Sequence, residues 1–393
     1  MPDLIPGTPV GISIYSVTQE APHHHEGFME IIYCFKGPVR ICSRSLDMLL
    51  EDGDIMSCDP FDIHYMEAVE TDKAESGGAK DNNTAEQHDT SAIDQPKHDT
   101  DVTGQINSGH RTSADRSSAT LHDSKRTSGT ETHADADNLL VSFYFDLQNP
   151  IFEKPDLDKL YFICEPSAIP ESKQENLAEL KRLLLTLLYF YCFPHPKLPR
   201  AETAVRFSKR IIQMMLDHFH YFYFNANSTE YSDEMKSLYE SIIVYIEKNY
   251  ASKITLESLC ETQHYNYKYL SHFFKKTSAV GFAKFLNNIR AYKAAFHLLE
   301  SNKNISEISY EVGFSAPMYF YKVFKMWNGT TPHQYRKKLR ELAASADENT
   351  YYDIITVKEE LEHFISFHFA QLQVPELWLT PYIPFKGVPS EQA

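Results

Sequence analysis

Four residues in the first part of the sequence have side chains that could hold a ligand or a metal ion. They are His23, His25, Glu30 and His64, and the first three follow the spacing His-x-His-x4-Glu. Imidazole and carboxylate groups that converge on one point suit a divalent ion such as iron, manganese or zinc. The same groups can also line a small-molecule pocket without metal, so both interpretations stay open at this stage.

A second set of side chains, basic and aromatic, gathers near the other end of the chain. Residues 235–340 contain 16 Lys and Arg against 7 Asp and Glu, which gives them a net charge of +9. Because the whole chain has a net charge of −16, the other residues together carry −25. An acidic protein is ordinarily a poor candidate for nucleic-acid binding. A basic module in an otherwise acidic chain reverses that inference and suggests a polyanionic partner for this module.

The elements that would position the first set are short strands. Apolar or alternating runs punctuated by Gly and Pro turns predict strands over residues 11–17, 29–35, 39–44, 54–58, 63–69 and 139–145. Many short strands of this kind favour a β-sandwich or barrel.

This N-terminal stretch resembles the small jelly-roll barrel of the cupin superfamily. The resemblance rests on His23-x-His25-x4-Glu30-x6-Gly37, then Gly53-Asp54, then Pro60-x3-His64, which lacks the usual Gly between its Pro and His. It implies an effector-sensing barrel over 1–71 and 139–165. We expect an effector pocket without a bound metal, and the candidate lining residues are His23, His25, Glu30, Tyr33 and His64.

Residues 72–138 interrupt this barrel with a different composition. They contain no Phe, Tyr or Trp and only four large aliphatic residues. Such a segment cannot bury enough apolar surface to offset the entropy of ordering, so we predict a disordered, low-complexity insertion between neighbouring strands.

Apolar helices are expected in the middle of the chain. Residues 177–191 and 201–224 carry Leu, Ile, Phe and Tyr at helical spacing, within a packing or dimerisation region at 166–232. They could pack on the barrel or on a second copy of the chain, and we favour dimerisation. The extension at 341–393 has no assignable role, although 357–371 could be an amphipathic helix.

Two similar helical units are expected in the basic module. Thr255 and Asn266 are competent N-caps for two short helices separated by a tight turn, which is the arrangement of a helix-turn-helix. The pattern returns about fifty residues later, with a capping box at Asn304-Ile305-Ser306-Glu307 and a turn at Gly313. Residues 282–300 predict a connecting helix of about 28 Å, which suits successive major grooves roughly 34 Å apart.

This module resembles the DNA-binding domain of the AraC/XylS family of bacterial transcription regulators. The matching text includes Tyr269-Leu270-Ser271-x-x-Phe274-Lys275-Lys276, Ile305-x2-Ile308-x3-Val312-Gly313-Phe314 and Thr331-Pro332-x2-Tyr335-Arg336. Ala279 replaces the family's usual Gly, and His272 stands where a basic residue is usual. The resemblance implies a multidomain α+β protein, in which a cupin-like jelly roll with flanking helices precedes an all-α domain at 235–340. That domain would contain two helix-turn-helix units joined by a linker helix.

By that resemblance, two groups of residues are candidates for contact with DNA. Groove-facing positions that could touch base edges are Lys268, Ser271, His272, Pro317, Met318, Tyr321 and Lys322. Basic positions that would contact phosphates are Lys275, Lys276, Lys325, Arg336 and Lys337. The large aromatic residues of the repeat, Phe274, Phe314, Phe320, Phe324, Trp327 and Tyr335, are expected in the core.

The sequence thus predicts a sequence-specific transcription regulator controlled by a small-molecule effector, for which sugars are one common class in the family. Its expected partners are double-stranded promoter DNA, RNA polymerase and a second copy of itself. We expect a cytoplasmic protein without cofactor or catalytic residues. The start of the sequence is unlike a secretory signal, no apolar window is long enough to span a membrane, and the six cysteines show no CxxC spacing.

Two other functions are compatible with parts of the sequence. One is a metal-dependent cupin enzyme fused to a DNA-binding module, which would use His23, His25, Glu30 and His64. The other is an RNA-binding or scaffold protein, which the two-unit spacing disfavours because A-form RNA closes its major groove to helices.

Overall fold

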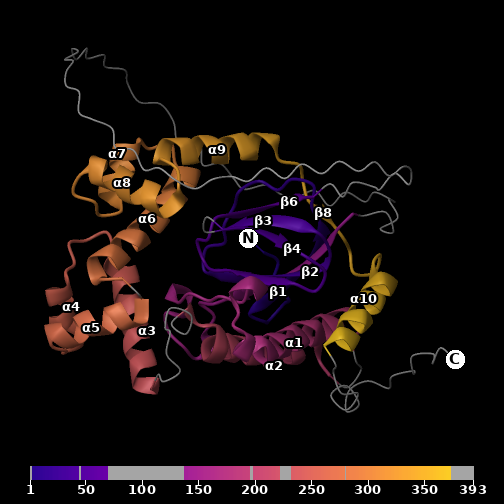
Figure 1. Ribbon diagram of the computed structural model, residues 1–393. Coiled ribbons are helices and arrows are strands. Elements are labelled where there is room, and N and C mark those ends of the chain that lie inside the picture. The colour runs from indigo at the N-terminus through magenta and orange to yellow at the C-terminus, as the bar shows by residue number, and fades with distance from the viewer. Residues whose placement is uncertain are drawn as a thin grey trace, which may run out of the picture. The chain divides into compact units, whose positions relative to one another are not determined.

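A computed structural model describes residues 2–43, 46–69, 137–194, 198–221, 232–278 and 280–372. The N-terminal region is built from β-sheets, and most of the later chain is helical (Figure 1). The strands are β1 (Val10–Ser16), β2 (Phe28–Lys36), β3 (Val39–Ser43), β4 (Leu46–Leu50), β5 (Ile55–Cys58), β6 (His64–Ala68), β7 (Leu139–Asp146) and β8 (Thr350–Tyr351).

These strands form two antiparallel sheets. One has the order β5-β2-β7-β1-β8 and the other the order β4-β3-β6. Successive side chains of a strand point to opposite faces, and alternate residues such as Ile32 and Cys34 of β2 join Ile41 and Met66 of the second sheet in a shared apolar cluster. The sheets therefore enclose a common interior, into which the even-numbered residues of β2 point.

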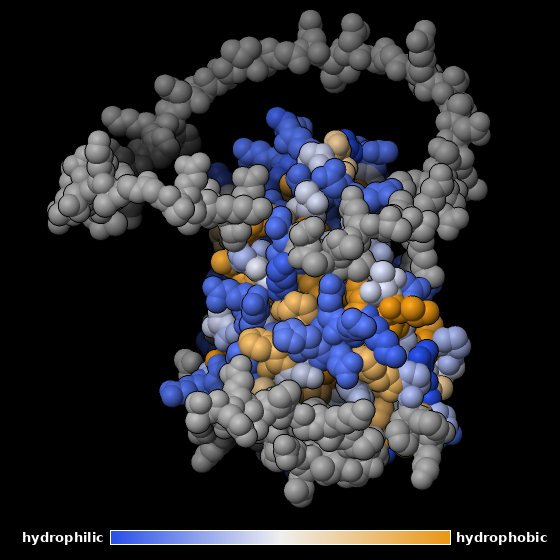
Figure 2. All heavy atoms as spheres, turned by 90° about the vertical axis from the view of Figure 1, so that its right-hand side faces the viewer, coloured by the Kyte–Doolittle hydropathy of each residue, from blue (hydrophilic) through white to orange (hydrophobic). Residues whose placement is uncertain are grey.

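Helices cover the other face of the five-stranded sheet. These are α1 (Gln174–Cys192), α2 (Arg200–Met214) and α10 (Lys358–Gln371), whose apolar residues share a second cluster with Ile31, Tyr33 and Phe35 of β2. Figure 2 shows the side of the molecule on which α10 lies, where apolar side chains reach the surface between hydrophilic ones. The apolar stripes of the middle helices thus pack on the sheet of their own chain, and dimerisation stays a prediction.

The C-terminal helices form two further apolar clusters. The helices are α3 (Asp233–Asn249), α4 (Leu256–Gln263), α5 (Tyr267–Ser278), α6 (Phe282–Glu300), α7 (Ile305–Glu311), α8 (Pro317–Asn328) and α9 (Pro332–Ser345). The first cluster joins α3, α4 and α5, and the second joins α7, α8 and α9. Helix α6 contributes Leu286 and Ile289 to the first and Leu298 to the second, so it connects the two cores.

Local expectations from the sequence agree closely with these elements. Each strand that we expected is present with bounds shifted by one residue at most, and the linker helix runs from Phe282 to Glu300 as expected. The helix expected over 201–224 differs, because α2 ends at Met214 and a short π-helical turn, Met215–Phe219, follows it. Strands β4 and β8 were not anticipated.

Nearly all of the expected insertion lies outside the described residues, whereas residues 341–372 of the C-terminal extension are described. Residues 72–136 of the expected insertion lie outside the described residues, whereas Asn138 is buried and its side chain pairs with the backbone of Val17. The flanking strands β6 and β7 belong to different sheets, so the expectation that they are neighbours is wrong. In the extension, β8 pairs with β1 and α10 packs on α1.

Candidate functional site

The first of the two expected helix-turn-helix segments comprises α4, a turn and α5. Thr255 caps α4 through a reciprocal capping box with Ser258. His264 ends α4 in the left-handed region at φ 57°, and the Asn266 side chain then accepts a hydrogen bond from the Tyr269 N–H at 2.8 Å to start α5. Both caps are the ones that the sequence indicated.

The second segment, α7 and α8, repeats this design with a glycine in the turn. Asn304 and Glu307 form the expected capping box. Gly313 has φ 91°, and a Cβ atom added there would lie 2.7 Å from the Ala251 carbonyl oxygen and 2.8 Å from that of Tyr250. Only glycine fits, because the turn of the second segment touches the backbone that directly follows α3.

Each second helix buries one face and exposes another. On α5 the buried apolar residues are Leu270, Phe273 and Phe274, and on α8 they are Phe320, Val323 and Phe324. The candidate DNA contacts lie on the remaining surface, as helical spacing requires. The exposed ones are Lys268, His272, Lys275, Lys276, Met318, Lys322 and Lys325, and the half-buried ones are Ser271, Pro317 and Tyr321.

Two candidates on α9 behave differently from each other. Lys337 is exposed and lies 3.5 Å from Glu341. Arg336 is half-buried, its Nε donates to the Leu298 carbonyl oxygen at 3.3 Å, and burial lowers the pKa of its guanidinium. The structure therefore gives Arg336 a packing role at the end of α6, which the spacing of the motif did not reveal.

Helix α6 holds the two segments in a fixed relation. Arg290 donates to the carbonyl oxygens of Tyr250 and Ser252, both at 2.8 Å, at the end of α3. The Asn287 amide donates to the Tyr319 hydroxyl of α8 at 2.9 Å. These contacts attach the chain after α3 and the first turn of α8 to the same linker helix.

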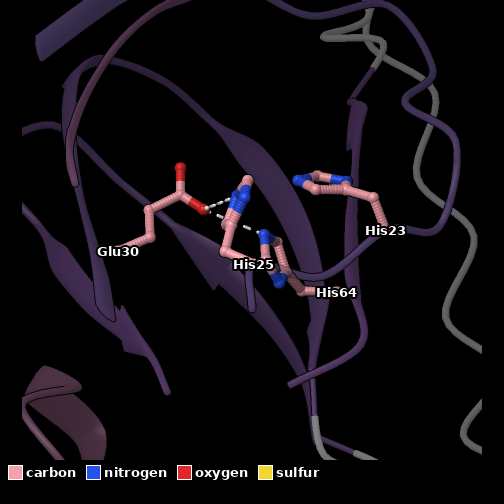
Figure 3. Close-up of side chains that lie close together, drawn as sticks. All are labelled: His23, His25, Glu30 and His64. Carbon is pink, nitrogen blue, oxygen red and sulfur yellow. Dashed lines mark hydrogen bonds and ion pairs between the residues drawn. The ribbon is translucent and has the colours of Figure 1, made fainter. Parts of the chain in front are cut away.

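The second candidate site is a cluster of three histidines and one glutamate between the sheets (Figure 3). Glu30 comes from β2, His64 begins β6, and His23 and His25 precede β2. His25 Nε2 lies 3.0 Å and His64 Nε2 2.9 Å from Glu30 Oε2, and both donate to it. One ligand atom from each of the four residues lies within 4.8 Å of the others.

The charges in this cluster oppose one another. Burial raises the pKa of the Glu30 carboxyl, because it disfavours the charged form. The charges and hydrogen bonds of His25 and His64 have the larger, opposite effect and hold this pKa well below its usual range. Burial also lowers the pKa of His64, yet Cys58 and Glu30 reverse this and hold it well above the ordinary value. Burial, with His64 and His25 nearby, lowers the pKa of His23. The cluster thus contains a carboxylate and a neutral imidazole at neutral pH.

Tyr33 does not belong to this cluster, although we expected it to line the same pocket. It lies on β2 three residues after Glu30, and an odd separation along a strand places two side chains on opposite faces. Its ring stacks on Phe35 at 4.9 Å between centroids and meets His368 of α10 at 5.4 Å. Tyr33 is therefore part of the packing between the sheet and the helices.

His24 is a residue that the motif analysis missed. His23 and His25 turn to the cluster, whereas His24 between them contacts α6, with its Nε2 3.2 Å from Glu300 Oε1 and its ring 4.7 Å from that of Phe296. The run of three histidines was visible in the sequence, and extended backbone would have predicted opposite directions for the middle one.

Comparison with known proteins gives one family match and several partial relatives. Residues 259–338 match the family described as a helix-turn-helix domain. An uncharacterized HTH-type transcriptional regulator of Escherichia coli K12, YijO, is 34% identical over 103 residues, which cover 26% of this chain and 36% of that protein. The bifunctional transcriptional activator/DNA repair enzyme AdaA of Bacillus subtilis is 33% identical over 96 residues, which cover 24% and 46% of the two chains.

A solved structure matches about a quarter of the chain. The C-terminal domain of the two-component response regulator yesN from Fusobacterium nucleatum is 35% identical and covers 26% of this chain and 99% of that one, with a TM-score of 0.24. The chain spans less than half the length of YijO and of AdaA. Among the helices of the described residues, none combines the length and the apolar character needed to cross a membrane.

Proposed function

Since the chain belongs to the AraC/XylS family of helix-turn-helix transcription regulators, we propose that it binds promoter DNA sequence-specifically and that a ligand in its N-terminal region controls this binding. The observation that carries the proposal is the repeated segment itself. Helices α5 and α8 each bury an aromatic face and expose a basic one, and α6 joins them. A single chain would thus present two recognition helices.

The geometry suits two adjacent major grooves. Helix α6 has 19 residues, which span about 28 Å, and successive major grooves on one face of B-DNA are roughly 34 Å apart. Exposed Lys322 and Met318 of α8 could contact a guanine edge and a thymine methyl group, respectively. Lys275 and Lys325, which are exposed, would neutralise phosphates.

The N-terminal region is the proposed sensor. Its two sheets suggest a cupin-like barrel, and the cluster of His23, His25, Glu30 and His64 supplies polar groups beside the apolar cluster between the sheets. Polar groups converging in a barrel are the usual form of a ligand site. A ligand there controls transcription only if it binds one disposition of the DNA-binding helices more tightly than another. A homodimer and contact with RNA polymerase complete the proposal.

The test is binding of the full chain to fragments of the DNA upstream of its own gene, across a series of salt concentrations. We expect one preferred fragment, and Lys322→Ala should cost about 1–3 kcal/mol on it and reduce the preference among sequences. Lys209→Ala is the matched control, because Lys209 is an exposed lysine of α2 paired with Glu153 outside the helix-turn-helix domain. Equal affinity for every fragment and for random DNA would contradict the proposal.

A further inference from the structure

We propose that three exposed tyrosines around the start of α5, Tyr265, Tyr267 and Tyr269, contact the two sugar–phosphate backbones that border the major groove of DNA. The contacts are uncharged: the hydroxyl groups donate to phosphate oxygens and the rings pack on deoxyribose. The proposal rests on the proposed function, because it concerns how α5 is held in the groove. These three residues are additional to the DNA contacts expected from the sequence.

The three side chains form an aromatic surface within five residues of the chain. Their exposed fractions are 41% for Tyr265, 53% for Tyr267 and 42% for Tyr269. Apolar residues that are exposed singly are common on proteins, whereas a contiguous group of them marks a binding site. Tyrosine suits such a site, because its ring is apolar and its hydroxyl group forms hydrogen bonds.

Helical geometry directs the tyrosines to the two sides of the surface expected to face the groove. Successive residues of an α-helix are about 100° apart around its axis, so Tyr267 and Tyr269 project to either side of Lys268. Lys268 is exposed, and it lies two residues before the fully buried Leu270, about 200° away around the axis. Lys268 therefore points away from the helical core, with one tyrosine on each flank.

One flank is a stack of aromatic rings that is fixed to the core. The rings of Tyr265 and Tyr269 lie 5.1 Å apart between centroids, and Tyr269 stacks in turn on the buried Phe273 at 6.2 Å. The Tyr265 N–H donates to the Cys260 carbonyl oxygen at 3.1 Å. The Tyr269 N–H donates to the Asn266 side chain at 2.8 Å. Rings held in this way lose little side-chain entropy when a partner binds.

The surroundings of these rings favour duplex DNA as the partner. The N-terminal residues of a recognition helix enter the major groove, and the two backbones border that groove on either side of the helix. Exposed Lys268, Lys275 and Lys276 of α5 supply the positive charge that attracts a polyanion. Tyrosine hydroxyl groups commonly donate to DNA phosphates and thereby fix the orientation of a protein on the duplex.

Helix α8 differs at the corresponding positions. The neighbours of exposed Met318 are Pro317 and Tyr319, so one flank carries a tyrosine ring and the other does not. The Tyr319 hydroxyl accepts a hydrogen bond from the Asn287 amide of α6 at 2.9 Å, and its ring lies 6.0 Å from that of Phe314. The paired tyrosine flanks are therefore a property of the first segment.

The test is DNA binding by the full chain with Tyr265→Phe, Tyr267→Phe and Tyr269→Phe combined, a change that removes only the hydroxyl groups. Fluorescence anisotropy measures affinity for the preferred fragment and for random DNA across a salt series. The triple variant should bind both at least about tenfold more weakly. The slope of log affinity against log salt should stay unchanged, because no cation is lost.

The matched control is Tyr351→Phe. Tyr351 is 50% exposed, and its ring lies 5.5 Å from that of Tyr15, outside the helix-turn-helix domain. This variant should bind DNA as the wild type does. All of the substituted side chains are exposed, so the variants should fold, and circular dichroism checks that they do.

Phosphate ethylation tests the direction of each side chain. Ethylation of a phosphate that the protein contacts weakens binding of the wild-type chain. Tyr267→Phe should abolish this effect at a phosphate of one strand and Tyr269→Phe at a phosphate of the other, because the two side chains project to opposite sides of α5. Effects of both variants on the same strand overturn the arrangement.

The outcomes separate this proposal from the proposed function. If one fragment is preferred and the triple variant binds it as tightly as the wild type does, the tyrosine contacts are overturned and the proposed function stands. If no fragment is preferred but the triple variant loses affinity for random DNA, sequence-specific binding fails and the contacts stand. A loss that depends on the base sequence overturns the backbone role. Unchanged DNA affinity with an altered oligomeric state overturns it in favour of a second copy of the chain.

Discussion

The ion pair between Lys293 of α6 and Glu247 of α3 offers a direct test of how the linker helix is held. Lys293 Nζ lies 2.7 Å from Glu247 Oε2, and the two side chains are 11% and 3% exposed. The other carboxylate oxygen of Glu247 accepts a hydrogen bond from the Tyr161 hydroxyl. We expect Lys293→Met to destabilise the protein strongly, because it leaves a buried carboxylate without its cation.

The magnitude follows from burial and distance. At 2.7 Å an effective dielectric constant of 20 gives an attraction of about 6 kcal/mol, and removing one partner of a buried pair typically costs about 3–5 kcal/mol. The double variant Lys293→Met with Glu247→Gln removes both charges and keeps a group for Tyr161 to donate to. It should recover at least about 2 kcal/mol of the loss.

Urea unfolding followed by far-ultraviolet circular dichroism measures both effects in a double-mutant cycle. Lys248→Met is the control, because Lys248 and Asp156 form a pair at 2.6 Å whose side chains are 51% and 30% exposed, and such exposed pairs contribute less than about 1 kcal/mol. A coupling below about 0.5 kcal/mol between Lys293 and Glu247 would refute the reasoning, since it would mean that water screens the pair.

Three further predictions concern other parts of the fold. Gly313→Ala should lower the free energy of unfolding by more than about 2 kcal/mol, because φ is 91° and the added Cβ meets two carbonyl oxygens; an unchanged urea midpoint would contradict this. Burial lowers the pKa of His220 to about 3, so the unfolded chain takes up a proton that the folded chain does not, and stability falls as the pH drops below about 6.5. Between pH 6.5 and 4.5 the wild-type chain should lose about 2.3 kcal/mol relative to His220→Phe, and parallel pH profiles would exclude this cause. Lys325→Ala should reduce the slope of log affinity against log salt by about 1 on every DNA sequence, whereas a sequence-dependent loss would assign Lys325 to base contact instead.

The helical module was predictable nearly residue by residue because its determinants are local. The N-caps Thr255 and Asn304 act within one turn of their helices, and the bounds of α6 follow from apolar spacing of about 3.6 residues. The sequence indicates Gly313 as a turn residue, but its close approach to Tyr250 depends on how the second segment packs against the chain that follows α3. That second constraint is tertiary and is not encoded in any short window.

The sheet region shows where such local reasoning fails. Strand β8 is only Thr350–Tyr351, and it exists because β1 offers an edge more than three hundred residues earlier in the chain. The assignment of Tyr33 to the pocket is wrong because it considers only the distance of Tyr33 from the motif along the sequence. It ignores the two-residue period of β2, which places Tyr33 and Glu30 on opposite faces of the sheet. The same period, applied to the histidine run, separates His24 from its two neighbours.

Helix α6 determines what kind of control the structure allows. Leu286 and Ile289 belong to the first helical core and Leu298 to the second, while Phe296 and Glu300 face the N-terminal region. A displacement transmitted to α6 therefore changes both cores together, because the helix is continuous from Phe282 to Glu300. We accordingly expect a ligand of the N-terminal region to alter affinity for both halves of a DNA site, and not to switch one recognition helix while the other stays engaged.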